Sequence, residues 1–188
     1  MGRPKALVEL DGEPLVRCAL RVLRDGGCAP LVVVVGAQAE RVRAVLPADV
    51  LAVVEPGWAE GMGASLRAGL AALARLDPQP VAALVHLVDL PGVSATAVAR
   101  LAGLVAPDVL ARAAYAGRPG HPVLIGRTHW PAVSGTATGD AGARGYLAGN
   151  PAVELVECGD VADPDDVDTP DQLTRARSER AHRHQRGP

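Results

Sequence analysis

The chain has 188 residues, of which 48% are apolar and 21% charged, as in an ordinary globular protein that folds as one domain. A formal net charge of −2 gives no electrostatic basis for binding nucleic acid or an anionic membrane. With two Trp, two Tyr and no Phe, the core must consist of Val, Leu and Ala, and few side chains could stack on bases.

Apolar runs alternate with segments of helical periodicity in the first half of the chain. Strands are predicted over residues 31–35, 51–54 and 81–88, and helices over residues 14–24, 39–46 and 62–76. In the last of these helices Leu66, Leu70 and Leu73 fall on one face. Apolar strands separated by helices are typical of a parallel sheet covered on both faces, so the predicted fold class is α/β.

The pattern changes after Pro91. Residues 95–105 read as a helix, residues 110–115 and 122–125 as a β-hairpin, residues 142–147 as a short helix and residues 153–157 as a last strand. Thr169 followed by Pro170 predicts the start of a terminal helix. We expect one domain over residues 1–174 and a basic, disordered tail over residues 175–188.

Cys18, Cys28 and Cys158 stand far apart and form no CxxC pair. This spacing is typical of small buried side chains in a reducing compartment, not of a disulfide framework. No stretch has the apolar length of a membrane span, and the N-terminus lacks the apolar region of a signal peptide. We therefore expect a cytoplasmic protein that is not membrane-bound.

Asp89 follows the longest predicted strand, in the sequence VDLP. Ligands of open parallel sheets bind beyond the carboxyl ends of the strands, so this carboxylate is expected to face the binding crevice. Beside a triphosphate it could hold Mg²⁺, a cation that prefers oxygen ligands. The alternative is a turn aspartate that caps the next helix.

Asp168 lies in an acidic stretch at the start of the terminal helix, with Asp163, Asp165, Asp166 and Asp171. Such a stretch can simply complement the helix dipole in solvent. Together with Asp89 it becomes a candidate second ligand of the same Mg²⁺, which nucleotidyl transfer needs to neutralise charge on the phosphates.

Gly61, Gly63 and Ser65 form a glycine-rich segment before a helix. Glycines allow close backbone approach, and the free N–H groups of a first helical turn favour an anion, so these residues are candidate nucleotide ligands. The alternative is a glycine turn with Ser65 as a cap residue.

His121 heads the second strand of the hairpin, and Asp140 and Arg144 lie in a glycine-rich loop. These residues are candidate ligands of a polar, phosphorylated second substrate. Alternatively, they serve the hairpin and the loop, with an Arg–Asp pair holding the loop. His86, inside an apolar strand, is interpreted as a hydrogen-bonded core residue.

The segments MGRPKAL, GMGASL, VDLPGV, GHPVLI, GDAGAR and DVDTPDQL follow one another in an order that resembles the molybdenum-cofactor nucleotidyltransferase family, the MobA-like NTP transferases. The resemblance covers Met1 to about Leu173. It implies a Rossmann-like three-layer sandwich of the nucleotide-diphospho-sugar-transferase type, with a mostly parallel sheet and a β-hairpin insertion. It also implies Mg²⁺-dependent transfer of NMP from an NTP to molybdopterin, with release of pyrophosphate.

By the same resemblance, Lys5 and Asp89 are the catalytic pair, and Asp89 and Asp168 are the metal ligands. The nucleotide-binding set is Arg3, Lys5, Gly61, Gly63, Ser65 and Asp89. His121, Asp140 and Arg144 fall in segments that face the pterin-type second substrate. A molybdoenzyme that receives the finished cofactor is a further expected partner.

Family members open with a strand and a glycine-rich loop of the form LAAGxSxRMGxPKAL, and this sequence starts at the Met of that motif. We therefore expect the first strand and the phosphate loop to be missing, with an unpaired slot left in the middle of the sheet. The hypothesis is an internal Met taken as the start, which translation of the upstream reading frame would test.

Several functions stay open at this point. CMP transfer leads, and GMP transfer is the nearest alternative. VDLP and GHPV also resemble NAD(P)H-dependent reductases of a nicotine-derived pigment, although no complete GxGxxG follows a strand. A third alternative is a non-catalytic module that delivers a cofactor.

Overall fold

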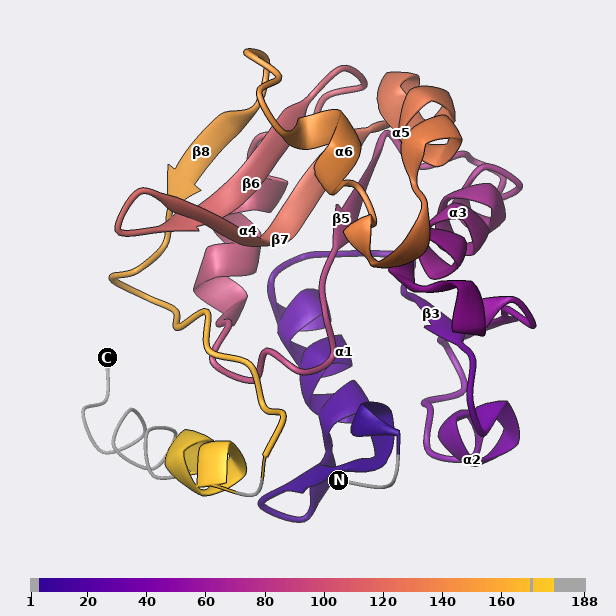
Figure 1. Cartoon of the computed structure of the whole chain (residues 1–188), viewed down its shortest axis with the longest axis vertical. Coiled ribbons are helices and arrows are strands. Elements are labelled where there is room, and N and C mark those ends of the chain that lie inside the picture. The colour runs from indigo at the N-terminus through magenta and orange to yellow at the C-terminus, as the bar shows by residue number, and fades with distance from the viewer. Residues whose placement is uncertain (1–3, 170, 178–188) are drawn as a thin grey trace.

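A computed structural model describes residues 4–169 and 171–177 of the chain (Figure 1). The strands are β1 (Glu9–Leu10), β2 (Glu13–Pro14), β3 (Val32–Val35), β4 (Leu51–Val54), β5 (Ala82–Val85), β6 (Leu110–Tyr115), β7 (Arg118–Gly126) and β8 (Glu154–Glu157). The α-helices are α1 (Leu15–Asp25), α2 (Ala39–Arg43), α3 (Met62–Leu73), α4 (Ala95–Ala102), α5 (Trp130–Thr136) and α6 (Arg144–Leu147), and residues 171–177 form a further helix. Short 3₁₀ turns are η1 (Lys5–Leu7), η2 (Trp58–Glu60), η3 (Arg127–His129) and η4 (Gly139–Ala141).

The larger sheet has the strand order β5-β7-β6-β8. β7 is antiparallel to both β5 and β6, and β8 is parallel to β6, so β7 alone runs against the other three. The predicted β-hairpin is β6–β7, which turns at Ala116 and Gly117, both with positive φ. The predicted α/β class is confirmed, and each segment that was predicted as a strand contains one.

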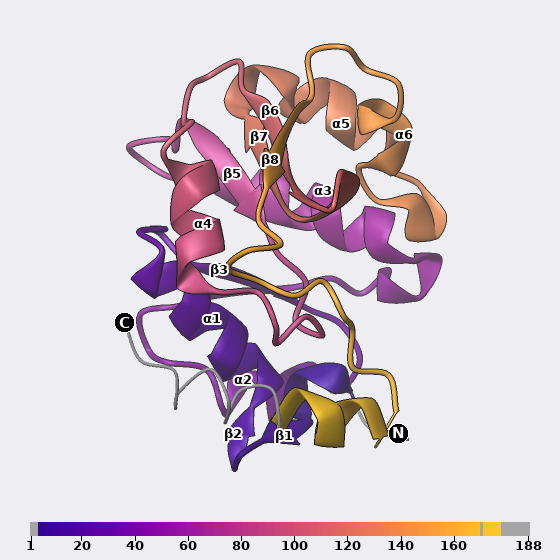
Figure 2. The ribbon, with the colours of Figure 1, turned by 90° about the vertical axis from the view of Figure 1, so that its left-hand side faces the viewer.

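Helices cover both faces of this sheet in three layers (Figure 2). On one face α4 packs with Val98 and Leu101 against Ala111 and Leu124 of the sheet. On the other face Leu70 of α3, Trp130 of α5 and Leu147 of α6 pack together against Val123 and Ile125 of β7. The alternation of side chains along β7 supplies both faces, as expected for a sheet buried on both sides.

The sheet is interrupted between β3 and β5. β3 and β4 pair in parallel, Val32 opposite Leu51, but they form a separate two-stranded sheet in the described part of the chain. Val16 and Leu20 of α1 pack under β3, and α3 lies close to Val34.

β5 is shorter than the predicted strand, because residues 86–88 are not part of it. The register that pairs Val85 with Val123 puts His86 opposite Pro122. Proline has no N–H to donate, so the hydrogen-bond ladder ends there. The prediction of a strand through Val88 was wrong for this reason.

The terminal helix predicted from Thr169 is present and runs over residues 171–177, past Arg175. The Thr169 hydroxyl accepts the backbone N–H of Gln172, and the Gln172 side chain accepts the N–H of Thr169, which is a reciprocal capping box. Leu173 and Ala176 pack against Val8, Leu10 and Leu15, so this helix lies beside the start of the chain. Residues 178–188 lie outside the described part, and the tail stays a prediction.

No helix within residues 4–169 and 171–177 has both the length and the apolar character needed to cross a membrane.

Candidate functional site

Asp89 lies in the loop that follows β5, where the sequence predicted a ligand-facing carboxylate. Its side chain is 18% exposed. Two backbone hydrogen bonds fasten the acidic segment to this loop: Val167 N–H donates to Asp89 O at 2.9 Å, and Asp163 N–H donates to Gly92 O at 3.1 Å. Val167 is 1% exposed, which anchors the segment. Asp168 is thereby held next to Asp89, although 79 positions separate them in the sequence.

Lys5 joins the two carboxylates. Its ammonium donates to Asp89 Oδ2 at 2.7 Å and also forms an ion pair with Asp168. Burial lowers the pKa of Lys5, but its hydrogen bonds to Asp168 and Asp89 and the charges of both carboxylates together raise the pKa more, so the net shift is upward. The same ammonium lowers the pKa of the Asp168 carboxyl. The structure therefore brings Lys5, Asp89 and Asp168 to one point.

The chemistry of these donors suits a hard cation. Asp89 and Asp168 present only oxygen atoms, and a positive charge already lies between them. Mg²⁺ is commonly held by one or two carboxylates together with waters and substrate phosphates. Within the described ranges no group of three or more His, Cys, Asp and Glu side chains forms a metal site, so the two carboxylates are the candidate ligands.

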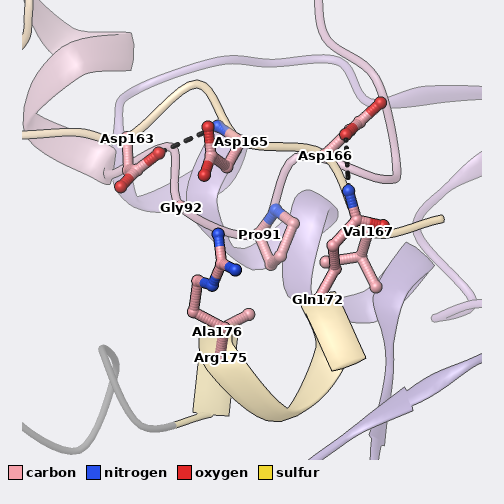
Figure 3. A pocket seen from close by; sticks show the side chains of 9 residues that line it. All are labelled: Pro91, Gly92, Asp163, Asp165, Asp166, Val167, Gln172, Arg175 and Ala176. Carbon is pink, nitrogen blue, oxygen red and sulfur yellow. Dashed lines mark hydrogen bonds between the residues drawn. The ribbon is translucent and has the colours of Figure 1, made fainter. Parts of the chain in front are cut away.

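A small cavity lies between the loop after Asp89, the acidic segment and the terminal helix (Figure 3). Its volume of about 20 Å³ is that of a single water and not of a nucleotide. The cavity is lined by Pro91, Gly92, Asp163, Asp165, Asp166, Val167, Gln172, Arg175 and Ala176. In Figure 3 the Arg175 side chain extends from the terminal helix toward Gly92, so the acidic segment has a cationic side chain beside it.

The glycines before α3 make close contacts with another loop. A Cβ on Gly61 would lie 2.4 Å from the carbonyl carbon of Gly139, and one on Gly63 would lie 2.8 Å from the backbone of Ala137. Gly61 also has φ +110°, a conformation that side chains disfavour. Ser65 lies inside α3, so it is not a cap residue; the N-cap is Gly61. These glycines let the start of α3 approach the loop that carries Asp140.

His121 reaches the carboxyl end of β5. Its Nδ1 lies 3.4 Å from Val85 O. Burial lowers its pKa, Arg112 and Arg144 lower it further, and Asp89 acts in the opposite direction. His121 is therefore subject to the charges of both Asp89 and the two arginines.

The loop with Asp140 and Arg144 is not held by an ion pair between them in the described part of the chain, so that alternative is not what the structure shows. Both residues are exposed. Arg67 of α3 holds the loop instead, because its guanidinium donates to Ala137 O.

Sequence reasoning missed Arg112, in the middle of β6. Its guanidinium donates from Nε at 3.3 Å and from Nη2 at 3.1 Å to Gly120 O. A single charged residue in the apolar stretch LARAAY was the signal that could have found it. Arg3 was expected to bind nucleotide, but it lies outside the described residues.

The profile of the MobA-like NTP transferase domain matches residues 1–155. The chain belongs to the MobA-like NTP transferase family. The predicted family is thereby confirmed, and membership places the chain among the nucleotidyltransferases.

Nicotine blue oxidoreductase of Paenarthrobacter nicotinovorans is one relative of the chain. The two sequences are 41% identical over 186 residues, which cover 93% of this chain and 89% of that protein. Among solved structures, Rv0371c from Mycobacterium tuberculosis H37Rv has a TM-score of 0.78 at 27% identity, with 95% of this chain and 90% of that chain covered. Rv0371c was also crystallised as a complex with manganese.

Molybdopterin-guanine dinucleotide biosynthesis protein A from Archaeoglobus fulgidus has a TM-score of 0.63 at 18% identity, covering 96% of this chain and 92% of that chain. At this identity the likeness shows the fold alone. It agrees with the Rossmann-like nucleotidyltransferase fold predicted from the sequence.

Proposed function

We propose that this MobA-like transferase moves NMP, with CMP first among the candidates, from an NTP to a phosphate of a pterin-type cofactor such as molybdopterin. In the reaction an oxygen of the acceptor phosphate bonds to the α-phosphorus of the NTP. The bond between that phosphorus and the bridging oxygen breaks, and pyrophosphate leaves. The observation that carries the proposal is the convergence of Lys5, Asp89 and Asp168 at one point in a chain of this family.

Asp89 and Asp168 are the residues that would hold Mg²⁺. When bound, this ion neutralises charge on the phosphates. The manganese complex of Rv0371c supports a divalent metal in a related fold, and Mg²⁺ is our choice for this chain.

Lys5 keeps its proton at neutral pH, because the two carboxylates raise its pKa. It can therefore donate to an oxygen of the triphosphate and offset the charge that develops there. The backbone N–H groups at the start of α3, with Gly61, Gly63 and Ser65, would serve as further donors to the nucleotide. His121, Asp140 and Arg144 would contact the acceptor.

A panel of CTP, GTP, ATP and UTP, each with Mg²⁺ and molybdopterin, tests the proposal through pyrophosphate release. We expect Asp89→Asn to lower the rate by on the order of a thousandfold, because the neutral amide weakens the hold on the cation. Asp49→Asn is the matched control: Asp49 is exposed and pairs with Arg24, remote from Lys5. Equal rates for the two variants would refute the role of Asp89, and GTP preference would replace CMP with GMP.

The name of the 41% identical relative favours a second candidate, an NAD(P)H-dependent reduction. The sequence contains no complete GxGxxG after a strand, which weakens the case for dinucleotide binding. Oxidation of NADPH with a quinone-like acceptor, measured beside pyrophosphate release, separates the two. Turnover of NADPH without turnover of any NTP would favour the reductase.

A further inference from the structure

Arg112 is a charged side chain in a position that otherwise takes apolar residues. Its neighbours in β6, Ala111, Ala113 and Ala114, are all buried. Side chains alternate along a strand, so Arg112 points to the same face as Leu110, which packs with Val123 of β7. This is the face covered by α3, α5 and α6.

The guanidinium of Arg112 is only partly used. Two of its N–H groups, Nε and one Nη, donate hydrogen bonds to Gly120 O. A guanidinium has five N–H donors, so most of them are left for another partner. Within the described ranges Arg112 forms no ion pair with a carboxylate.

A second arginine lies on the same side of the sheet. Arg144 is the first residue of α6, and the helix is fixed over β6 and β7 because Leu147 and the adjoining Ala143 pack with Leu110 and Val123. Arg144 is exposed and, like Arg112, has no carboxylate partner among the described residues. The two cations are close enough that burial, followed by the charge of Arg144, lowers the pKa of Arg112.

Bringing two cations together at a half-buried position is unfavourable unless an anion joins them. A phosphate fits best, because planar guanidinium groups bind its oxygens in a bidentate manner. The nearest acids do not serve: Asp89 is paired with Lys5, and Asp140 forms no ion pair with either arginine in the described part. Gly120, whose carbonyl accepts from Arg112, precedes His121, and the His121 ring lies at the carboxyl end of β5, the strand that leads to Asp89.

We propose that Arg112 and Arg144 form a binding site for the phosphate monoester of the acceptor. The inference rests on the proposed function and adds to it a residue that specifies a phosphorylated second substrate. Arg112 acts from the sheet and Arg144 from α6. The chemistry would equally suit a phosphate of the NTP, so the experiment must separate the two sources.

Calorimetric titration of the full chain with inorganic phosphate, and separately with Mg-CTP, makes this test. We expect Arg112→Met to weaken phosphate binding by about tenfold or more, and to leave Mg-CTP binding within about twofold. Arg127→Met is the matched control, since Arg127 is exposed at the opposite end of β7 and should change neither. Arg144→Met, at an exposed site, repeats the test should Arg112→Met fail to fold.

Phosphate affinity unchanged in both arginine variants would overturn the proposal. An equal loss of phosphate affinity in Arg127→Met would also overturn it, because it would indicate only a general attraction of anions to the surface. An equal loss of Mg-CTP affinity in the arginine variants would assign the arginines to the nucleotide instead. Transfer kinetics distinguish the two proposals. If Arg112→Met is active with a normal KM for the acceptor, the phosphate site is refuted and the proposed function stands. If phosphate binding depends on Arg112 but no NMP is transferred, the proposed function is refuted and the phosphate site stands.

Discussion

Burial of His86 makes the stability of this fold depend on pH. The residue follows β5, and its Nδ1 is buried without a hydrogen-bond partner among the described residues. Burial lowers the pKa of His86 to about 4, with a further lowering from His121 and an opposing effect of Asp89. The prediction of a hydrogen-bonded histidine inside a strand was wrong on two points, because His86 follows β5 and its buried Nδ1 has no hydrogen-bond partner among the described residues.

The sign and size of the effect follow from the two pKa values. Above about pH 6.5 the ring is neutral in both the folded and the unfolded chain, so it contributes nothing. As the pH falls from 6.5 toward 4, the unfolded chain binds a proton that the folded chain does not, and the free energy of unfolding decreases. The pKa difference of about 2.5 corresponds to about 3 kcal/mol, of which about 2.5 kcal/mol is lost by pH 4.5.

Urea denaturation of the wild type and His86→Leu at pH 7.5 and pH 4.5 measures this loss. Carboxylates such as Asp168 titrate in both proteins, so the difference between the two pH dependences isolates His86. We expect the free energy of unfolding of the variant to fall less between the two pH values, by about 2.5 kcal/mol. The same fall in both proteins would refute the reasoning.

Two further changes test how the fold holds the site. Gly61→Ala should destabilise the chain by about 1–3 kcal/mol, because residue 61 has φ +110° and its new Cβ would meet the backbone of Gly139. Gly135→Ala in α5 is the control and should be neutral or stabilising, because nothing lies within 4 Å of the added Cβ. Thermal denaturation compares the two variants. Equal melting temperatures would contradict the close contact. Thr169→Ala should lower the free energy of unfolding, measured by urea denaturation, by about 1 kcal/mol because the capping box is lost, whereas Thr169→Ser should retain most of the stability. An equal loss of stability in both variants would show that the cap hydrogen bond is not the cause.

The predicted elements with strong apolar patterns are the ones that the structure contains. β3, β4 and β8 lie within a residue of their predicted bounds, since Val- and Leu-rich runs have few other stable arrangements. α5 was missed because WPAVSGT has Gly, Ser and β-branched residues, and burial of Trp130 and Val133 outweighs that low helix propensity. β1 and β2 were missed too, although Asp11-Gly12 is a recognised hairpin turn signal.

The candidate site likewise has features that the sequence predicts and features that it does not. The closeness of Asp89 and Asp168 could be predicted, because one follows a strand end and the other precedes a helix in an acidic segment. Their tie through Val167, and the guanidinium of Arg112 facing α6, depend on register and on which helix covers which face. A linear pattern does not contain that information, since it depends on pairings across more than 40 positions.

The interrupted sheet divides the cooperativity of the molecule. β3 and β4 share a backbone ladder with each other and with no strand of the larger sheet in the described part, so side-chain packing, including that of α1 and α3, couples them to the rest. Loosening either helix therefore weakens the hold on both strands together, whereas β6 and β7 keep each other in place. Because Gly61 caps the start of α3, the pair opens next to the segment that would contact a nucleotide.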